Sequence, residues 1–360
     1  MNLKSIKHIV LTTLGTIFLV SCNKSDDIIG KEINTASANF KLTTDLSTST
    51  DSPNFIATFG AKGLFFTAEY NEEVTSTIDL VGLESGAVKR IIVEKSDTLT
   101  ETNSFWNGNH DGLYFFKTGE EVVYTLSFYG SDLIYTDTVT ITQAYDFIKE
   151  DVTTTIPNGN FDLDPNFTNG EWFVGNNAVF WNQNSTTDIL PVQGTGFIYA
   201  EGQRTPAGSY MDGASQGGRN GLFFDLPADP SRVWVNVYSY GFGPDNAHTN
   251  MYLVMLEADS VGLAVPNATN AAGVDDGMAW AIPSDHEGWA LQSIKYSDIP
   301  FPTYCVPGVE GGGCGNKVRE PNRIDLLALS FESDDFEKKS YSALDFIMFT
   351  VDEPLDPSKF

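Results

Sequence analysis

Residues 232–240, with the sequence RVWVNVYSY, constrain the fold more than any other stretch of the chain. Strand side chains point alternately to opposite faces, so Val233, Val235 and Val237 share one face. The other face carries Trp234, Asn236, Tyr238 and Tyr240. The valine face predicts packing against a core. The aromatic face requires either a ligand or a covering layer of protein, and both interpretations are open.

Alternating runs of this kind recur along the chain, with no competing helical period. Between residues 39 and 146 they lie at short intervals with Gly, Asn, Asp and Ser between them, which is the spacing of a small β-sandwich. A linker over 146–157 follows, and residues 155–354 contain about eight further expected strands, the number of a jelly roll. The sequence therefore predicts an all-β protein with a smaller sandwich followed by a larger jelly-roll sandwich.

The N-terminus predicts export from the cell. Lys4 and Lys7 precede the apolar run 9–20, which is too short to span a bilayer and is typical of a signal peptide. The run ends in Leu-Val-Ser-Cys at residues 19–22, which resembles the lipobox of bacterial lipoproteins. That resemblance implies a signal peptide over 1–21 and a lipid on Cys22. The alternative is an ordinary secretory signal in which Cys22 is incidental.

The polar residues 22–38 predict a flexible tether between the lipid and the first domain. Their start, NKSDD at 23–27, is similar to the acidic tag of surface-exported lipoproteins in glycan-degrading Gram-negative bacteria. This resemblance implies a protein on the outer membrane, exposed at the cell surface and held there by its lipid anchor alone.

Two cysteines remain if Cys22 is lipidated. Cys305 and Cys314 enclose a glycine-rich loop, and an even pair in an exported protein favours a disulfide. Closing this loop would stabilise the fold by about 2–3 kcal/mol through the unfolded state. Free thiols or a metal site are the alternatives.

The formal net charge of −27 excludes several partners. Nucleic acid binding needs a basic footprint, so no nucleic acid partner is expected. Strongly anionic polysaccharides are disfavoured too, although Lys317, Arg319 and Arg323 form a local basic patch. Most of the charge is explained by the solubility of a surface-exposed protein.

No motif predicts catalysis. The G-x-S-x-G string at 213–217 lacks the strand before it and the helix after it that a hydrolase nucleophile requires, so we interpret it as a glycine-rich turn. Adjacent acids such as Asp275 and Asp276 lie in a Gly- and Ala-rich loop, whereas glycosidases hold carboxyl groups at defined separations on a rigid frame. Neither a zinc-protease motif nor a phosphate-binding loop is present. A protein without enzymatic activity is expected.

Residues 106–128 resemble the later half of a PKD or immunoglobulin-like module, in which a glycine-containing turn leads into a strand ending in T-L-x-F. The resemblance implies that the first domain is a spacer. Trp106 is expected in its core rather than on a ligand surface.

The second domain resembles carbohydrate-binding modules of the galactose-binding-like jelly-roll type. The resemblance lies in NGNFDLDPNFTNGEW at 158–172 and in SALDFIMF at 342–349, which are similar to the first and last strands of those modules. In that family, acids at these two places share a structural calcium ion, which implies Asp162 and Asp345 as ligands. Two solvated or capping aspartates are the alternative.

Aromatic residues recur where a jelly roll would present its concave sheet or its rim. Sugars offer apolar faces that cover an aromatic ring, and each ring contributes about 1.5 kcal/mol, so several must act together. The predicted glycan contacts are Trp234, Asn236, Tyr238 and Tyr240 on one strand face, with Trp181, Trp280 and Trp289. A position in the core is the alternative for these rings.

Taken together, the chain resembles the surface glycan-binding lipoproteins that accompany polysaccharide-uptake systems. This implies capture of a polysaccharide, with a neutral one favoured by the charge, for an outer-membrane glycan transporter complex. The first rival is a polysaccharide lyase or glycoside hydrolase. The second is a structural adhesion lipoprotein.

Overall fold

The protein is described by a computed structural model. The description covers residues 33–49, 54–56, 63–143, 153–155, 173–174, 179–183, 189–203, 214–217, 224–258, 274–301, 316–335 and 337–357. Regular structure in these ranges is almost entirely strand, with one short helix, α2 (Glu101–Ser104), and a few 3-10 turns. The all-β fold predicted from the sequence is therefore confirmed. No helix in the described part is both long and apolar enough to span a bilayer.

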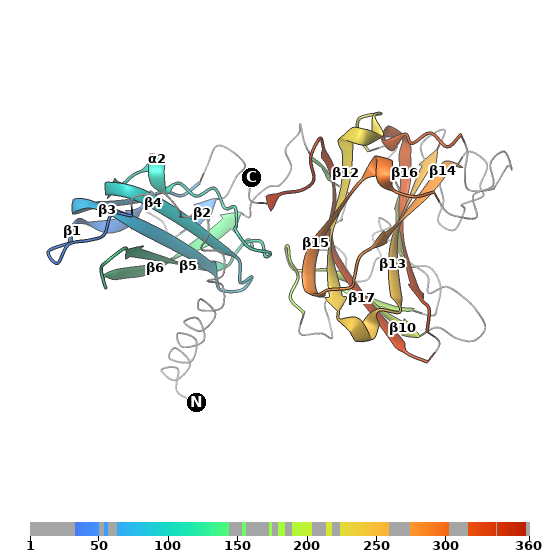
Figure 1. Cartoon of the computed structure of the whole chain (residues 1–360), viewed down its shortest axis with the longest axis horizontal. Coiled ribbons are helices and arrows are strands. Elements are labelled where there is room, and N and C mark those ends of the chain that lie inside the picture. Colours follow the sequence, from blue (N-terminus) through green and yellow to red (C-terminus); the bar gives the residue numbers. More distant parts are fainter. Residues whose placement is uncertain are drawn as a thin grey trace.

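Six strands form a first unit, shown in blue and green in Figure 1. They are β1 (Leu42–Thr48), β2 (Asn54–Ile56), β3 (Phe66–Gly82), β4 (Val88–Leu99), β5 (Glu121–Phe128) and β6 (Ile134–Gln143). All six belong to one hydrogen-bonded sheet in the order β1-β3-β5-β6-β2, with β4 also paired to β3.

The long strand β3 replaces two strands expected over 63–70 and 74–81. Its first residues pair with β1 and its later residues with β5, while β4 pairs along its other edge. Register shifts in the β3–β4 ladder, between Glu69 and Val74 and between Val74 and Ser76, mark where β3 departs from regular pairing. Such irregularities bend a strand, so β3 can pair first with β1 and then with β5 without a break in the strand.

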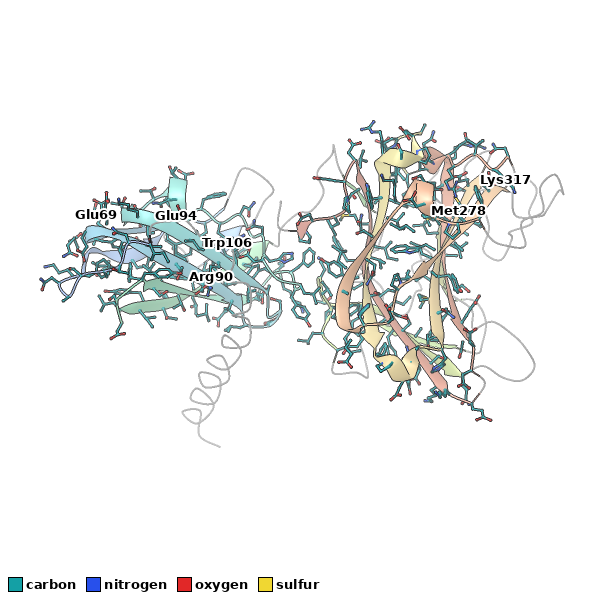
Figure 2. All side chains as sticks on the ribbon, in the orientation of Figure 1. Glu69, Arg90, Glu94, Trp106, Met278 and Lys317 are labelled. Atoms are coloured by element: carbon teal, nitrogen blue, oxygen red, sulfur yellow. The ribbon has the colours of Figure 1, made fainter. Side chains whose placement is uncertain are left out.

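Trp106 lies in the core of the first unit, as predicted. It is 1% exposed, its ring meets Phe116 edge to face at 4.9 Å, and its Nε1–H donates to the Asn109 carbonyl at 2.8 Å. Figure 2 shows it on the side of the unit nearer the second unit.

The second unit contains two sheets. The strands are β7 (Thr153–Thr155), β8 (Phe173–Val174), β9 (Val179–Gln183), β10 (Ile198–Gln203), β11 (Ala214–Gly217), β12 (Val233–Phe242), β13 (Thr249–Ala258), β14 (Val274–Ile282), β15 (Glu287–Lys295), β16 (Ile324–Ser333) and β17 (Lys339–Val351). One sheet, called here the β12 sheet, has the order β15-β12-β17-β10-β9 with β7 beside β17; the other, the β13 sheet, has the order β14-β13-β16-β11-β8.

The valine face of β12 packs into the core between these sheets. Val233, Val235 and Val237 are fully buried and share one hydrophobic cluster with Met251, Leu253 and Met255 of β13. Each buried valine contributes about 1.5–2 kcal/mol through apolar area removed from water. Met278 of β14 lies in the same core (Figure 2). The sequence prediction for this face is confirmed.

Three segments of the second unit differ from the sequence prediction. The expected loop 259–278 ends in strand β14, whose residues Met278, Trp280 and Ile282 alternate into the core; Asp275, Asp276 and Gly277 hid this pattern. The expected strand over 221–226 has no strand at 224–226. Residues 214–217 form strand β11 rather than a turn, and Ser215 pairs with Ala328 and Phe173 on its two sides.

Replacing Gly241 by alanine is expected to destabilise the second unit. An added Cβ would lie 1.9 Å from the carbonyl oxygen of His286, which is backbone and cannot move without opening the β12–β15 pair. We expect a loss of about 2 kcal/mol or more in the free energy of unfolding, measured by urea denaturation. Gly112→Ala is the control, since its Cβ would meet only the end of the Val88 side chain at 3.2 Å. Equal stability of the two variants would contradict this packing.

Candidate functional site

The candidate site lies on the outer face of the β12 sheet, opposite the core. Figure 1 shows β12, β15 and β17 in the layer nearer the first unit. The alternation along β12 places Trp234, Asn236, Tyr238, Tyr240 and Phe242 on this face, because the intervening valines point into the core. The structure divides this face into a covered part and a partly exposed part.

Asn236 belongs to the covered part, so the prediction that it meets a ligand is wrong. It is fully buried, and its Nδ2 donates to the Met348 carbonyl at 3.2 Å and to Thr350 Oγ1 at 3.0 Å. Its Oδ1 accepts from Ser293 Oγ at 2.8 Å and from the Leu355 amide at 2.9 Å. These bonds use the amide to tie β12 to its two neighbouring strands and to the C-terminal segment.

Tyr238 is covered by the first unit, so the prediction that it is open to a ligand is also wrong. Its side chain is 1% exposed and meets the ring of Phe115 edge to face at 5.8 Å. Burial raises the pKa of the Tyr238 hydroxyl well above its ordinary value. At Tyr238, the aromatic face of β12 is therefore covered by a layer of protein rather than open to a ligand.

Asp345 supports the loop that completes this cover. It is fully buried, and its Oδ2 accepts from the amides of Val192 at 2.7 Å and Gln193 at 3.0 Å. The Val192 carbonyl in turn accepts from the Phe115 amide of the first unit at 2.9 Å. The ring of Phe115 also packs on Phe346, at 5.3 Å between centroids.

The predicted calcium site is not formed within the described residues. Asp162 lies outside them, and they contain no group of three or more His, Cys, Asp or Glu side chains placed to hold a metal. Oδ2 of Asp345 accepts hydrogen bonds from two backbone amides. Calcium binding by Asp162 and Asp345 stays a prediction.

The two predicted rim tryptophans are buried, so neither presents a face to a ligand. Trp280 is 5% exposed in the core between the sheets. Trp289 is 7% exposed; its Nε1–H donates to the Leu190 carbonyl at 2.8 Å, and its ring packs on Phe197 and Tyr240. Their spacing around a predicted loop did not reveal that Trp280 lies in the core between the sheets, nor that Trp289 is covered on the outer face of the β12 sheet.

Trp234 is partly exposed but separate from Tyr240. The Nζ of Lys295 lies 5.1 Å from the centroid of its ring. Six residues of strand separate Trp234 from Tyr240, or about 20 Å, so they do not share one sugar. Trp181 pairs with Ala200 in the backbone of β9, and its side chain is outside the description. Cys22, Cys305 and Cys314 also lie outside the described residues.

The rest of the face holds four aromatic rings, called here the aromatic patch: Tyr240, Phe242 and Tyr341, which are partly exposed, and Tyr199, which is buried beside them at 6% exposure. Phe242 lies at the centre. Its ring is 4.9 Å from Tyr240, 5.6 Å from Tyr341 and 6.3 Å from Tyr199, at interplanar angles of 58°, 36° and 61°. Three strands thus contribute to one apolar surface.

Polar groups border the aromatic patch. Tyr199 donates its hydroxyl to Glu201 Oε2 at 3.0 Å, and Lys339 Nζ lies 3.6 Å from Glu201 Oε1. Asn246 fixes the backbone of Tyr341, donating to its carbonyl at 2.7 Å and accepting from its amide at 2.9 Å. Burial, and then Glu201, raise the pKa of the Tyr199 hydroxyl, which therefore stays a hydrogen-bond donor.

Of these four rings the sequence prediction named Tyr240 alone. Phe242 could have been found, because it continues the alternation two residues further along the strand. Tyr199 and Tyr341 could not, because they reach the patch only through the pairing of β10 and β12 with β17, which no local pattern specifies.

A serine–histidine contact lies behind this face. Ser239 Oγ donates to the Pro283 carbonyl at 2.9 Å and lies 3.1 Å from His286 Nε2. Since the hydroxyl gives its one proton to the carbonyl, it accepts from the protonated Nε2. A histidine in that state cannot activate the serine as a base, so this contact is structural.

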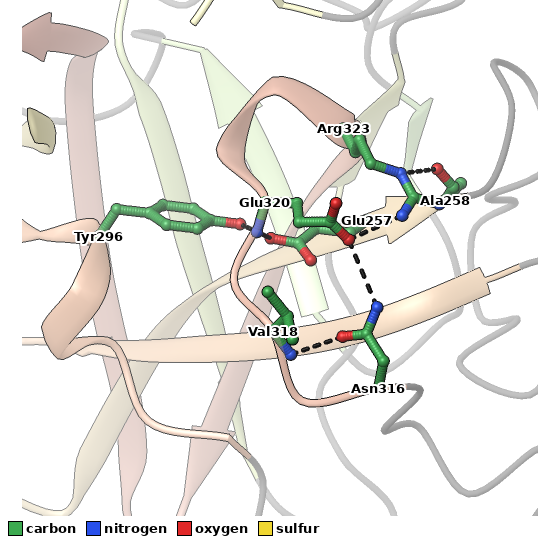
Figure 3. A network of polar contacts seen from close by, with 7 residues as sticks. All are labelled: Glu257, Ala258, Tyr296, Asn316, Val318, Glu320 and Arg323. Atoms are coloured by element: carbon green, nitrogen blue, oxygen red, sulfur yellow. Dashed lines mark hydrogen bonds and ion pairs between the residues drawn. The ribbon is translucent and has the colours of Figure 1, made fainter. Parts of the chain in front are cut away.

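A second polar network is buried at the end of β13, as Figure 3 shows. Glu257 Oε1 accepts from the hydroxyl of Tyr296 and from the amide of Glu320, both at 2.7 Å. Arg323 Nη1 pairs with Glu320 Oε2 at 2.7 Å. The network fixes residues 316–323 against the sandwich, and Glu257 is fully buried within it.

Burial, with smaller contributions from Asp276 and Glu320, raises the pKa of Glu257 to about 7. The folded state therefore holds this proton more tightly than the unfolded chain. Its contribution to stability is greatest below pH 4.5 and is lost as the pH rises through 7.

Glu257→Gln is expected to stabilise the protein at pH 8 and to have little effect near pH 4.5, because glutamine is neutral at both. A gain of roughly 1–3 kcal/mol in the free energy of unfolding at pH 8 follows from the size of the pKa shift. Urea denaturation over pH 4.5–8 measures it, with the exposed Glu337→Gln as control. A gain independent of pH, or a loss at pH 8, would contradict the burial of a protonated carboxyl group.

The sequence matches no protein-family model and no curated protein. Several solved structures are similar. A family 11 carbohydrate-binding module of a Clostridium thermocellum cellulase is 10% identical, over 51% of this chain and 88% of that one, with a TM-score of 0.32.

Two further structures extend this comparison. SGBP-B from a complex xyloglucan utilization locus in Bacteroides uniformis is 10% identical, covering 86% of this chain and 98% of that one, with a TM-score of 0.33. The CBM22-1 xylan-binding domain of Paenibacillus barcinonensis Xyn10C is 12% identical, over 57% and 97%, with a TM-score of 0.28. These values are too low to transfer a function, which has to be inferred from the site.

Proposed function

We propose that this protein binds a polysaccharide on the aromatic patch without cleaving it. The observation that carries the proposal is the gathering of the partly exposed rings of Tyr240, Phe242 and Tyr341 into one surface, supported by the buried ring of Tyr199 and bordered by hydrogen-bonding groups. Sugars have apolar C–H faces that cover such rings and hydroxyls that bond to polar groups at the border.

The number of rings in the aromatic patch is enough for measurable binding of a polysaccharide. Each ring that a sugar covers contributes about 1.5 kcal/mol, so one ring does not offset the loss of freedom on association. Three rings with a few hydrogen bonds reach roughly millimolar to micromolar dissociation constants. That range fits a protein that captures a chain and then releases it.

The tilt of the rings favours a single soluble chain. Neighbouring rings of the patch meet at 36–61°, so they do not form the flat platform that a crystalline polysaccharide surface would need. The formal charge of −27, with Glu201 at the border, disfavours anionic sugars. A neutral glucan or mannan is the proposed substrate class.

The spacing of carboxylates around the patch supports binding without hydrolysis. Glu201 lies in β10 and Glu287, opposite Phe242, lies in β15; the backbones of these strands are three strand spacings apart, or about 14 Å. Glycosidases place their two carboxyl groups about 5–9.5 Å apart. A polysaccharide lyase or glycoside hydrolase is the alternative, and released oligosaccharide would identify it.

The cellular role that we propose is the one expected from the sequence. We propose that residues 1–21 are removed, that a lipid on Cys22 anchors the protein in the outer membrane at the cell surface, and that the bound chain is passed to an outer-membrane glycan transporter complex. The lipobox-like residues 19–22 and the acidic residues after them support this role.

Loss of the central rings is expected to abolish binding. Phe242→Ala combined with Tyr341→Ala removes two of the four rings of the patch, so retardation should disappear in native gels containing hydroxyethylcellulose, xyloglucan, galactomannan or laminarin. Calorimetry should show affinity lowered at least 100-fold, from about 3 kcal/mol of lost ring contact.

Trp234→Ala is the matched control. Trp234 is an aromatic residue of the same strand face, about 20 Å from Tyr240, the nearest ring of the patch on that strand, and this variant should bind as the wild type does. Loss of binding in this variant alone would move the site to Trp234. Absence of binding by the wild type to every glycan tested would favour the adhesion alternative.

A further inference from the structure

The first unit meets the outer face of the β12 sheet through Phe115, which lies in the segment 106–116. Phe115 is seated on the β12 sheet, with its ring on Tyr238 and Phe346 and its amide bonded to the Val192 carbonyl at 2.9 Å. The contact is fully buried, since Phe115 and Tyr238 are each 1% exposed. Residues on either side of Phe115 are therefore held at a fixed place relative to the second unit.

The same segment is also anchored within the first unit. Phe116 packs edge to face on the core residue Trp106 at 4.9 Å, and His110 packs on Phe115 at 4.2 Å. Burial lowers the pKa of His110 to about 4, so the imidazole is neutral at physiological pH and introduces no charge into the contact. The segment is therefore held by buried contacts with both units.

Tyr114 precedes Phe115 and differs from it in exposure. Its side chain is partly exposed and packs on the same hydrophobic cluster as Tyr240, Phe242 and Tyr341. Phe115 is seated on Tyr238, and Tyr240 is the next residue along the same face of β12, so Tyr114 is placed near Tyr240. Burial, and after it Tyr240, raise the pKa of the Tyr114 hydroxyl, in agreement with this placement. An aromatic ring of the first unit thus lies beside the rings of the second.

We infer that the binding site is composite: Tyr114 of the first unit forms one wall of the aromatic patch and contacts the same polysaccharide chain. This inference rests on the proposed function. It gives the first unit a part in recognition beyond the spacer role expected from its sequence. A chain bound in this way crosses the junction between the units.

Tyr114→Ala in the full-length protein tests the composite site. We expect affinity for the neutral polysaccharides named above to fall about five- to tenfold, the loss of one stacked ring, with the melting temperature nearly unchanged because Tyr114 is partly exposed. Tyr114→Phe keeps the ring and should retain most of the affinity. Calorimetry and affinity gels measure both variants.

Tyr129→Ala is the control within the first unit. Tyr129 follows the last residue of β5, whereas Tyr114 precedes the first residue of that strand. The strand separates its two ends by about 25 Å, so this change should leave affinity unchanged. If Tyr114→Ala binds like the wild type while Phe242→Ala with Tyr341→Ala does not bind, the inference fails and the proposed function stands. Equal losses in Tyr114→Ala and Tyr129→Ala would also overturn it. If the wild type binds none of these glycans, both proposals fall.

Discussion

The alternation of side chains along β12 is the constraint on which the rest of the second unit depends. One face of this strand carries Val233, Val235 and Val237, which pack into the core against the β13 sheet. The other face is polar and aromatic, and its environment changes along its length. Asn236 ties neighbouring strands together, Tyr238 receives Phe115 of the first unit, and Tyr240 and Phe242 lie in the aromatic patch.

The contact between the two units divides the outer face of the β12 sheet into a covered part and a partly exposed part. Asp345 holds the loop around Val192, that loop bonds to Phe115, and Phe115 closes over Tyr238. The cover ends before Tyr240. A face that would otherwise expose a long apolar surface is thereby reduced to a compact patch with three partly exposed rings, which is the size of surface that suits a ligand rather than aggregation.

How far the sequence predicts this structure depends on which contacts are local. The valine face and the all-β class follow from side-chain period and turn residues, and both are confirmed. The burial of Asn236, Tyr238, Trp280 and Trp289 depends on what packs over each residue, and strand period is silent about that. Tyr341 joins the patch through strand register, which is set by tertiary packing rather than by neighbouring residues.

In the proposed complex, a polysaccharide chain lies on the aromatic patch. A crystal structure of the full-length protein soaked with an oligosaccharide of a glycan that it retains tests this most directly. The structure predicts sugar rings stacked on Phe242 and Tyr341, with hydroxyl groups bonded near Glu201 and with Tyr114 in contact at one end. Sugar bound instead around Trp234, or on the first unit alone, would contradict the account.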